Sequence, residues 1–115
     1  NEIHFSTYAR VDESISTDQH IAFLDADKIS FPLILRKRRQ SDYFYPLGMM
    51  KKKKVSRFLS DKKLSPVDKE KVWLIEMDKK LIWVVGIRID ERFKVTESTK
   101  QVLKIQLFNT SGKSA

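Results

Sequence analysis

The chain has 115 residues, which suits a single domain, and 41% of them are hydrophobic, enough to build a core. It has no cysteine, which excludes disulfides and thiolate metal sites, and no apolar run long enough to predict a membrane span. The net charge is +8, and the 28 residues from Arg36 to Lys63 alone carry eleven Lys/Arg against two Asp. This local excess is typical of a surface that meets a polyanion, most commonly nucleic acid.

The first third of the chain predicts two strands joined by a polar loop. Apolar and polar residues alternate over residues 3–7, which indicates a strand, and the apolar run 21–24 indicates a buried one. Residues 12–19 are rich in Ser, Thr and Asp and predict a loop, whereas 25–28 predict a turn or one helical turn. The chain begins without Met and without a signal peptide, so we interpret it as a piece of a longer protein.

The middle of the chain predicts a strand followed by two short helices. Residues 31–36 predict an apolar strand. Because Pro32 lacks an N–H, this strand should either lie at the edge of its sheet or start at Pro32. Pro-Leu-Gly at 46–48 fits a tight turn. Apolar residues at helical spacing within 55–59 predict one helix, and the Ser-Pro pair at 65–66 predicts the capped start of another.

The last third is rich in residues that favour strands. Runs 72–75 and 81–85 flank a short polar turn and outline a hairpin, and we expect Gly86 to form a bulge after it. Residues 102–108 predict a final strand. The predicted fold is therefore α+β, a mixed or antiparallel sheet with two short helices inserted mid-chain.

No catalytic constellation is visible in the sequence. The histidines, His4 and His20, have no HExxH motif or cysteine ligand beside them, and three glycines cannot build a phosphate-binding loop. Asp25 and Asp27 are spaced to share one face of a strand, which would suit acid/base chemistry or Mg²⁺ binding. Alternatively, the two carboxylates only balance the charge of neighbouring cations such as Lys28. We expect no catalytic residue and no metal site in this chain.

The basic segment contains two cationic runs with aromatic residues between them. A strand that reached Arg38 would place the guanidinium groups of Arg36 and Arg38 on one face, and guanidinium grips phosphate through two parallel hydrogen bonds. Tyr43 and Tyr45 either stack unpaired bases or brace the loop, and the sequence leaves that choice open. Phosphate-backbone binding is the favoured interpretation, and a solvated surface, a membrane or an acidic protein are the alternatives.

Four stretches of the chain form a specific ensemble. They are the strand Phe-Pro-Leu-Ile-Leu-Arg-Lys-Arg at 31–38, the loop Asp-Tyr-Phe-Tyr-Pro-Leu-Gly-Met at 42–49, the lysine-led helix at 53–59, and the segment 82–96 with Trp-Val-Val-Gly and Arg-Ile-Asp. Together they resemble the C-terminal domain of bacterial tRNA(Ile)-lysidine synthetase over about residues 20–107. The chain departs from the family pattern at Ser41 and at 50–52, where glycine is common, which implies a stiffer loop.

The resemblance implies a function in tRNA processing. Such an enzyme is a cytoplasmic ligase that uses ATP, with Mg, to attach lysine to the wobble cytidine of an isoleucine tRNA. Its catalytic domain lies N-terminal and carries a Ser-Gly-Gly-x-Asp-Ser loop, which is absent here, so enzymatic activity of this fragment stays uncertain. We therefore expect an N-terminal strand and linker at 1–19, a C-terminal tRNA-binding domain at 20–108 and a flexible tail at 109–115.

The resemblance also implies the partners and the contact residues. The partners would be the acceptor-stem region of the tRNA and the enzyme's own N-terminal catalytic domain. The carried-over phosphate contacts are Arg36, Arg38, Lys53, Lys54 and Arg57, with Lys37, Arg39, Lys51 and Lys52 among the cations that supply an attracting field. One alternative is a structural domain that docks on the catalytic domain or forms a homodimer, without RNA contact. A weaker one is a free-standing enzyme that uses Asp25 and Asp27.

Overall fold

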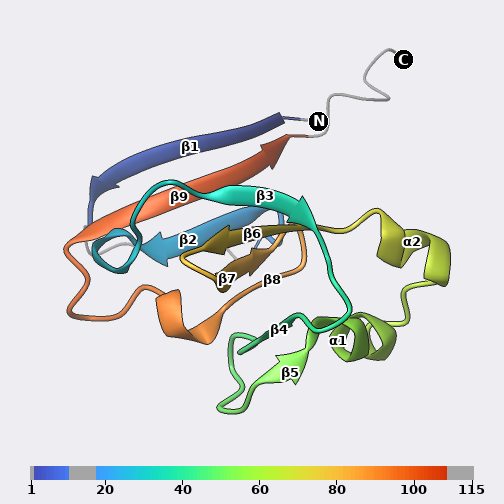
Figure 1. Cartoon of the computed structure of the whole chain (residues 1–115). Coiled ribbons are helices and arrows are strands. Elements are labelled where there is room, and N and C mark those ends of the chain that lie inside the picture. The colour runs from blue at the N-terminus through green and yellow to red at the C-terminus, as the bar shows by residue number, and fades with distance from the viewer. Residues whose placement is uncertain (1, 11–17, 109–115) are drawn as a thin grey trace.

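A computed structural model describes residues 2–10 and 18–108, which form two antiparallel sheets, a two-stranded ribbon and two short α-helices (Figure 1). The strands are β1 (Glu2–Ala9), β2 (Ile21–Asp25), β3 (Ile34–Lys37), β4 (Tyr43–Phe44), β5 (Lys53–Lys54), β6 (Trp73–Met77), β7 (Lys80–Val84), β8 (Arg88–Ile89) and β9 (Gln101–Phe108). The helices are α1 (Val55–Asp61) and α2 (Pro66–Glu70), with single 3₁₀ turns η1 (Ala26–Lys28) and η2 (Glu91–Phe93). The predicted α+β class is confirmed, in its antiparallel form.

The first sheet joins the two ends of the described chain. Its strand order is β1-β9-β2, and β1 pairs with β9 over eight residues, from Glu2 opposite Phe108 to Ala9 opposite Gln101. The strand expected near the N-terminus is therefore present and belongs to this first sheet. Most of the predicted loop at 12–19, and the whole tail at 109–115, lie outside the described residues.

The second sheet lies in the middle of the molecule and has a hydrophobic core on each face. Its order is β3-β6-β7-β8. One face, with Ile75 and Trp83, packs in a cluster that includes Leu24 of the first sheet. The opposite face, with Leu74, packs in a second cluster with residues of the β4–β5 ribbon and of α1, among them Phe44. Figure 1 shows the consequence: the first sheet lies on one side of this central sheet, and the ribbon with α1 on the other.

The two helices follow the predicted local rules. Helix α1 buries Val55, Phe58 and Leu59 on one face, and the Phe58 ring meets Phe44 edge-on, with centroids 5.1 Å apart. Helix α2 is capped by Ser65, whose hydroxyl accepts from the Asp68 N–H at 3.1 Å, and it has proline at its start. Apolar periodicity sufficed for these predictions because each helix is local. No helix in the described ranges is both long and apolar enough to cross a membrane.

Two strand details differ from the expectation. β3 begins at Ile34 rather than at residue 31, so Pro32 precedes the strand, and β3 lies at the edge of its sheet. The bulge expected at Gly86 lies instead in β7, where a register shift against β6 leaves Ile82 as the extra residue. Gly86 occupies the next turn with a φ of +78°, a conformation that glycine adopts without strain, and Ile87 closes that turn by donating to the Val84 carbonyl.

Candidate nucleic-acid interface

Arg36 is held inside a cluster of carboxylates. Its two terminal nitrogens each donate to an Asp42 oxygen at 2.8 Å, and its Nε donates to Glu76 at 2.7 Å. Only 13% of its side chain is exposed. Burial acts to raise the pKa of Asp42, but hydrogen bonds from Arg36 and from the Arg39 N–H outweigh burial and hold it below its ordinary value. Arg36 thus fixes the loop after β3, and its predicted phosphate contact would compete with two carboxylates.

The next two cations turn toward α2. The Lys37 ammonium lies 4.5 Å from the centroid of the Trp73 ring and donates to the Glu70 carbonyl at 2.9 Å. The Arg38 guanidinium lies 3.7 Å from the Glu70 carboxylate, and its Nε is buried without a hydrogen-bond partner. Because β3 ends at Lys37, strand alternation does not extend to Arg38. Arg36 and Arg38 consequently meet different carboxylates on different elements.

The β4–β5 ribbon separates its own lysines. Tyr43 pairs with Lys54, and Phe44 pairs with Lys53. Because directly opposite residues share a face and Phe44 is buried beneath α1, Lys53 lies on the helix side of the ribbon. Lys54 lies on the other side with Tyr43.

On the helix side, one carboxylate serves two cations. The Lys53 ammonium forms an ion pair with Asp61, and the Arg57 Nε lies 3.7 Å from the same carboxylate. The hydrogen bond from Lys53 is the main reason that the pKa of Asp61 lies below its ordinary value. Lys53 and Arg57 therefore offer less net charge to a phosphate than their sequence positions implied.

On the opposite side of the ribbon, the neighbours of Tyr43 are the cations Lys52 and Lys54. The Lys52 ammonium lies 4.7 Å from the Tyr43 ring centroid. Tyr43 is 46% exposed and meets the Tyr45 ring edge-on, with the centroids 6.4 Å apart. A half-exposed aromatic ring beside ammonium groups is the combination that single-stranded nucleic acids stack on.

Beside Tyr43 the surface is hollowed into a polar cavity of about 230 Å³. Its lining comes from three separate segments of the chain: Arg36, Arg39, Ser41, Asp42 and Tyr43; Glu76, Lys79, Lys80 and Leu81; and Arg92. We name it the basic hollow. Lys79, Lys80 and Arg92 were not among the predicted contacts. Lys79 and Lys80 lay in an expected hairpin turn, so their exposure was predictable, but their proximity to the 39–43 loop was not.

Arg92 lines the basic hollow and is held in place by a buried carboxylate, Asp90. Its Nε and one terminal nitrogen donate to the two oxygens of Asp90 at 3.0 Å, and its guanidinium stacks 4.4 Å from the Tyr45 ring centroid. Asp90 is fully buried and also accepts from the Tyr45 N–H at 2.9 Å. These contacts fasten the start of η2 to the loop that follows β4, and hydrogen bonding to Asp90 raises the pKa of Arg92.

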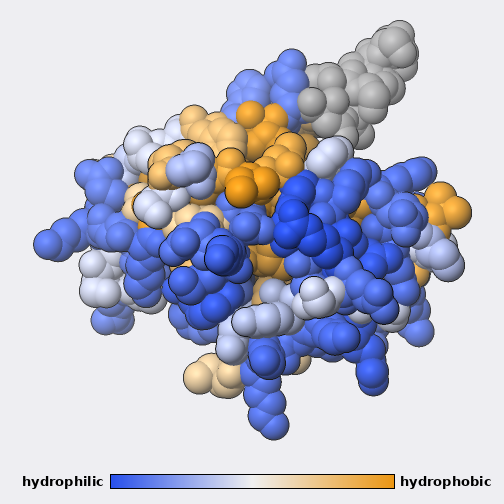
Figure 2. All heavy atoms as spheres, in the orientation of Figure 1, coloured by the Kyte–Doolittle hydropathy of each residue, from blue (hydrophilic) through white to orange (hydrophobic). Residues whose placement is uncertain are grey.

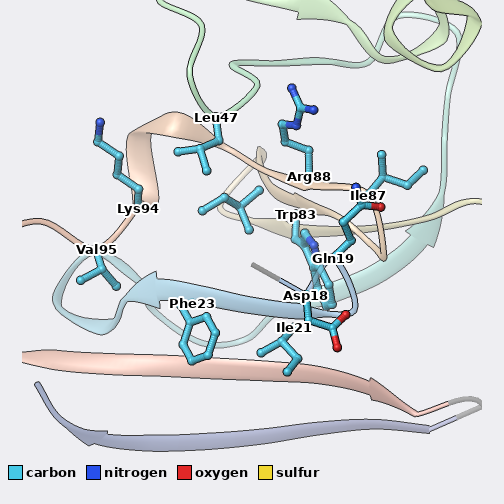
Figure 3. A pocket seen from close by; sticks show the side chains of 11 residues that line it. Asp18, Gln19, Ile21, Phe23, Leu47, Trp83, Ile87, Arg88, Lys94 and Val95 are labelled. Carbon is cyan, nitrogen blue, oxygen red and sulfur yellow. The ribbon is translucent and has the colours of Figure 1, made fainter. Parts of the chain in front are cut away.

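A larger cavity, of about 440 Å³, has a different character. It lies between β2 and β8 and is lined largely by apolar side chains, among them Ile21, Phe23 and Leu47. Figure 3 shows the charged ends of Arg88 and Lys94 pointing away from Phe23 and Ile21. This cavity therefore presents no cation toward its floor, and it does not contribute to an anion-binding surface.

The cations predicted as phosphate contacts thus lie in several separate groups and do not form one continuous surface. Arg36 is enclosed, Lys37 and Arg38 face α2, and Lys53 and Arg57 face Asp61. Arg39, Lys52 and Lys54 lie around Tyr43 and the basic hollow, and Lys51 is exposed nearby in the sequence. Figure 2 shows mostly hydrophilic residues on the face that carries the end of β3, the ribbon and the helices, with small hydrophobic areas at its margins.

The carboxylates considered for catalysis have structural partners. Asp25 is 3% exposed, and it accepts from the Asp27 N–H at 3.0 Å to cap η1. Asp27 accepts from the Lys100 N–H at 3.4 Å. Within residues 2–10 and 18–108, no group of three or more His, Asp or Glu side chains is placed to hold a metal ion. The geometry favours capping of η1 over acid/base chemistry for this pair.

Comparison with known proteins identifies relatives over most of the chain. The model of the TilS substrate C-terminal domain family matches residues 33–107. A tRNA(Ile)-lysidine synthase of Parabacteroides distasonis is 46% identical over 93 residues, which are 81% of this chain and 21% of that protein. The corresponding protein of Caldanaerobacter subterraneus is 36% identical over 94 residues, 82% of this chain and 20% of that protein. The chain thus spans about one fifth of the length of these relatives.

Solved structures support the fold. A crystal structure of a TilS C-terminal domain superposes with a TM-score of 0.75 at 17% identity, covering 90% of this chain and 80% of that one. An N-terminal fragment of the phenylalanyl-tRNA synthetase β-subunit from Pyrococcus horikoshii superposes with a TM-score of 0.61 at 22% identity, covering 74% of this chain and 27% of that one. At these identities the likeness concerns the arrangement of the elements.

Proposed function

This chain belongs to the family of TilS substrate C-terminal domains, and we propose that it is the tRNA-recognition module of a tRNA-modifying ligase. The relatives that it matches are named tRNA(Ile)-lysidine synthases, and the chain corresponds to about a fifth of each. Lysine attachment to the wobble cytidine, together with ATP and Mg binding, would belong to the other four fifths. In this proposal the chain contacts phosphates near the acceptor stem, in the cytoplasm.

The observation that carries the proposal is the set of cations around Tyr43. Lys52 and Lys54 lie on the exposed side of the ribbon, and Arg39 lies in the neighbouring basic hollow. Within the described part of the chain, none of these three side chains forms an ion pair with a carboxylate. Unpaired cations keep their full charge for a phosphate, whereas a paired cation must first give up its partner. We therefore give these three residues more weight than Arg36.

Structured RNA suits such a surface. The major groove of an A-form helix is too narrow for side chains to read, so a double-stranded stem is recognised mainly through its shape and its phosphates. Lysines spread over a rigid ribbon can match the spacing of phosphates without reading a base. The ribbon is rigid because Phe44 is fully buried against Phe58.

A salt series tests the proposal directly. The affinity of the chain for isoleucine tRNA is measured from low to moderate salt. If about four phosphates are neutralised, the logarithm of the binding constant should fall with that of salt at a slope of roughly −3 to −4. The double variant Lys52→Ala/Lys54→Ala should flatten the slope by about 2. Lys104→Ala, which removes one charge from β9 in the first sheet, should leave the slope unchanged. A binding constant insensitive to salt contradicts the proposal.

A second candidate function is docking on another protein surface. Strand β3 lies at the edge of its sheet, and Leu35 on β3 and Trp73 on β6 are each more than 40% exposed. Exposed apolar residues beside an open edge strand favour association with the catalytic domain or with a second copy. Sedimentation across a concentration series measures self-association. A dimer that Leu35→Lys dissociates, while tRNA affinity is kept, would favour docking.

A further inference from the structure

The basic hollow has an excess of cations that its carboxylates do not neutralise. Five of its lining residues are cationic and two are carboxylates. Both carboxylates, Asp42 and Glu76, are engaged by Arg36 at the floor. Arg92, another cation of the lining, forms a salt bridge with the buried Asp90. The hollow therefore keeps a net positive charge even when Asp90 is included.

Three cations at its rim form no salt bridge with a carboxylate among the described residues: Arg39, Lys79 and Lys80. Arg39 interacts with Asp42 through its charge, without a close ion pair. Arg39 belongs to the loop after β3, Lys79 belongs to the turn between β6 and β7, and Lys80 is the first residue of β7. Each of these segments is fixed. The first is held by the Arg36–Asp42 ion pair, and the second is a two-residue turn between paired strands. The cations thus converge from rigid supports, which lowers the entropic cost of binding an anion between them.

The hollow also has one aromatic wall. Tyr43 lines it and is 46% exposed, so part of the ring faces a potential ligand. The volume of the basic hollow, about 230 Å³, is below the roughly 300 Å³ at which pockets for drug-sized ligands begin. A single phosphate with its attached sugar or base matches this size, the charge and the aromatic wall together.

We propose that the basic hollow is a discrete binding site for one RNA phosphate, gripped jointly by Arg39 and Lys80, with the attached nucleoside against Tyr43. Arg36 acts as a positioning residue, because it holds Asp42 and the loop rather than the phosphate. This inference rests on the proposed function, and it differs from a diffuse cationic field in predicting that two cations from distant segments share one phosphate. The phosphate is either an internal phosphodiester or a terminal phosphomonoester.

The salt slope distinguishes one shared phosphate from two separate ones. Removal of one protein–phosphate interaction should flatten the slope for tRNA binding by about 1. Arg39→Ala and Lys80→Ala should each flatten it by about 1, and the double variant should still flatten it by about 1, because both substitutions release the same phosphate. A change of about 2 in the double variant, or no change in either single variant, overturns the shared site. Both side chains are exposed, so these variants should stay folded.

A second experiment tests the hollow without tRNA. Inorganic phosphate is titrated into the chain, and backbone amide resonances are followed by NMR. Saturable shifts confined to residues 39–43 and 79–81, and abolished in the double variant, support the site. Shifts spread over all lysines, or shifts unchanged in the double variant, overturn it. If phosphate binds here but tRNA does not bind the chain, the proposed function fails while the anion site stands. If tRNA binds with an unchanged slope in the double variant, the shared phosphate site fails while the function stands.

Two oligonucleotides distinguish the sources of the phosphate. One short single-stranded RNA carries a 5′-monophosphate and the other has the same sequence without it. A terminal site predicts tighter binding of the phosphorylated form, and the difference should vanish in the Arg39→Ala/Lys80→Ala variant. An internal site predicts equal binding of both forms by the native chain and equal weakening of both in the variant. Equal binding of both forms by the native chain and the variant overturns the site for either source.

Discussion

The guanidinium of Arg36 donates to both carboxylate oxygens of Asp42, six positions further along the chain, at 2.8 Å. The same guanidinium reaches Glu76 on the neighbouring strand β6. Asp42 in turn accepts from the Arg39 N–H at 2.6 Å, so one carboxylate fixes both the side chain before the loop and the backbone within it. This cluster gives the most basic part of the chain a defined path.

Loss of Arg36 should therefore cost stability rather than binding alone. Arg36→Ala leaves Asp42 and Glu76 nearly buried without their cation, and breaking a buried ion pair costs about 3 kcal/mol. Urea denaturation measures the free energy of unfolding. Arg39→Ala is the control, since that side chain is exposed and should change stability by less than about 0.5 kcal/mol. Equal stability of the two variants would contradict the anchoring role.

Acid should weaken the same cluster. The folded-state pKa of Asp42 lies below its ordinary value, so the stability it contributes is fully present above about pH 4, the ordinary range of an aspartate. That contribution is lost as the pH falls further, through the folded-state pKa. The free energy of unfolding at pH 5, 4 and 3 should decline more for the native chain than for Asp42→Asn. If the free energy of unfolding declines equally in the native chain and in Asp42→Asn, Asp42 does not contribute to the acid sensitivity.

Glycine should be tolerated within the turn between β6 and β7 but not in the strand that follows it. Asp78 and Lys79 have φ values of +48° and +66°, the left-handed conformations of the turn that two-residue hairpins prefer. Lys79→Gly relieves about 1 kcal/mol of backbone strain, of which part is lost to the greater entropy of the unfolded chain, so we expect a small net gain in stability. The matched change Lys80→Gly lies in β7 and should destabilise by roughly 0.5–1 kcal/mol. Thermal unfolding of the two variants measures the difference.

The ribbon should depend on the contact between its buried ring and α1. Phe58 is 3% exposed and lies edge-on to Phe44, so Phe58→Ala should cost about 3–5 kcal/mol. Measurement of the free energy of unfolding checks this value. The affinity for tRNA should also fall, because the substitution removes the packing that supports Lys52 and Lys54. The control is Phe31→Ala, which removes a ring that is 65% exposed and should have little effect on stability. A tolerated Phe58→Ala would mean that the ribbon has other support.

Local features of the fold were predictable because they depend on neighbours in sequence. Helical spacing of Val55, Phe58 and Leu59 identified α1, and the Ser65–Pro66 pair identified the start of α2. The prediction failed at Gly86, where a single glycine satisfies either a bulge or a turn with positive φ. The register of β6 against β7 decided between them.

The sequence by itself determined the charge of the basic segment and, through the ensemble of motifs, the family to which the chain belongs. Only the tertiary structure decided which cations keep their charge for a ligand. A cation is neutralised by whatever carboxylate the fold brings within reach, and Glu76 lies forty residues from Arg36. The hollow beside Tyr43 arises in the same way, because three segments distant in sequence meet there through strand pairing and the buried Asp90.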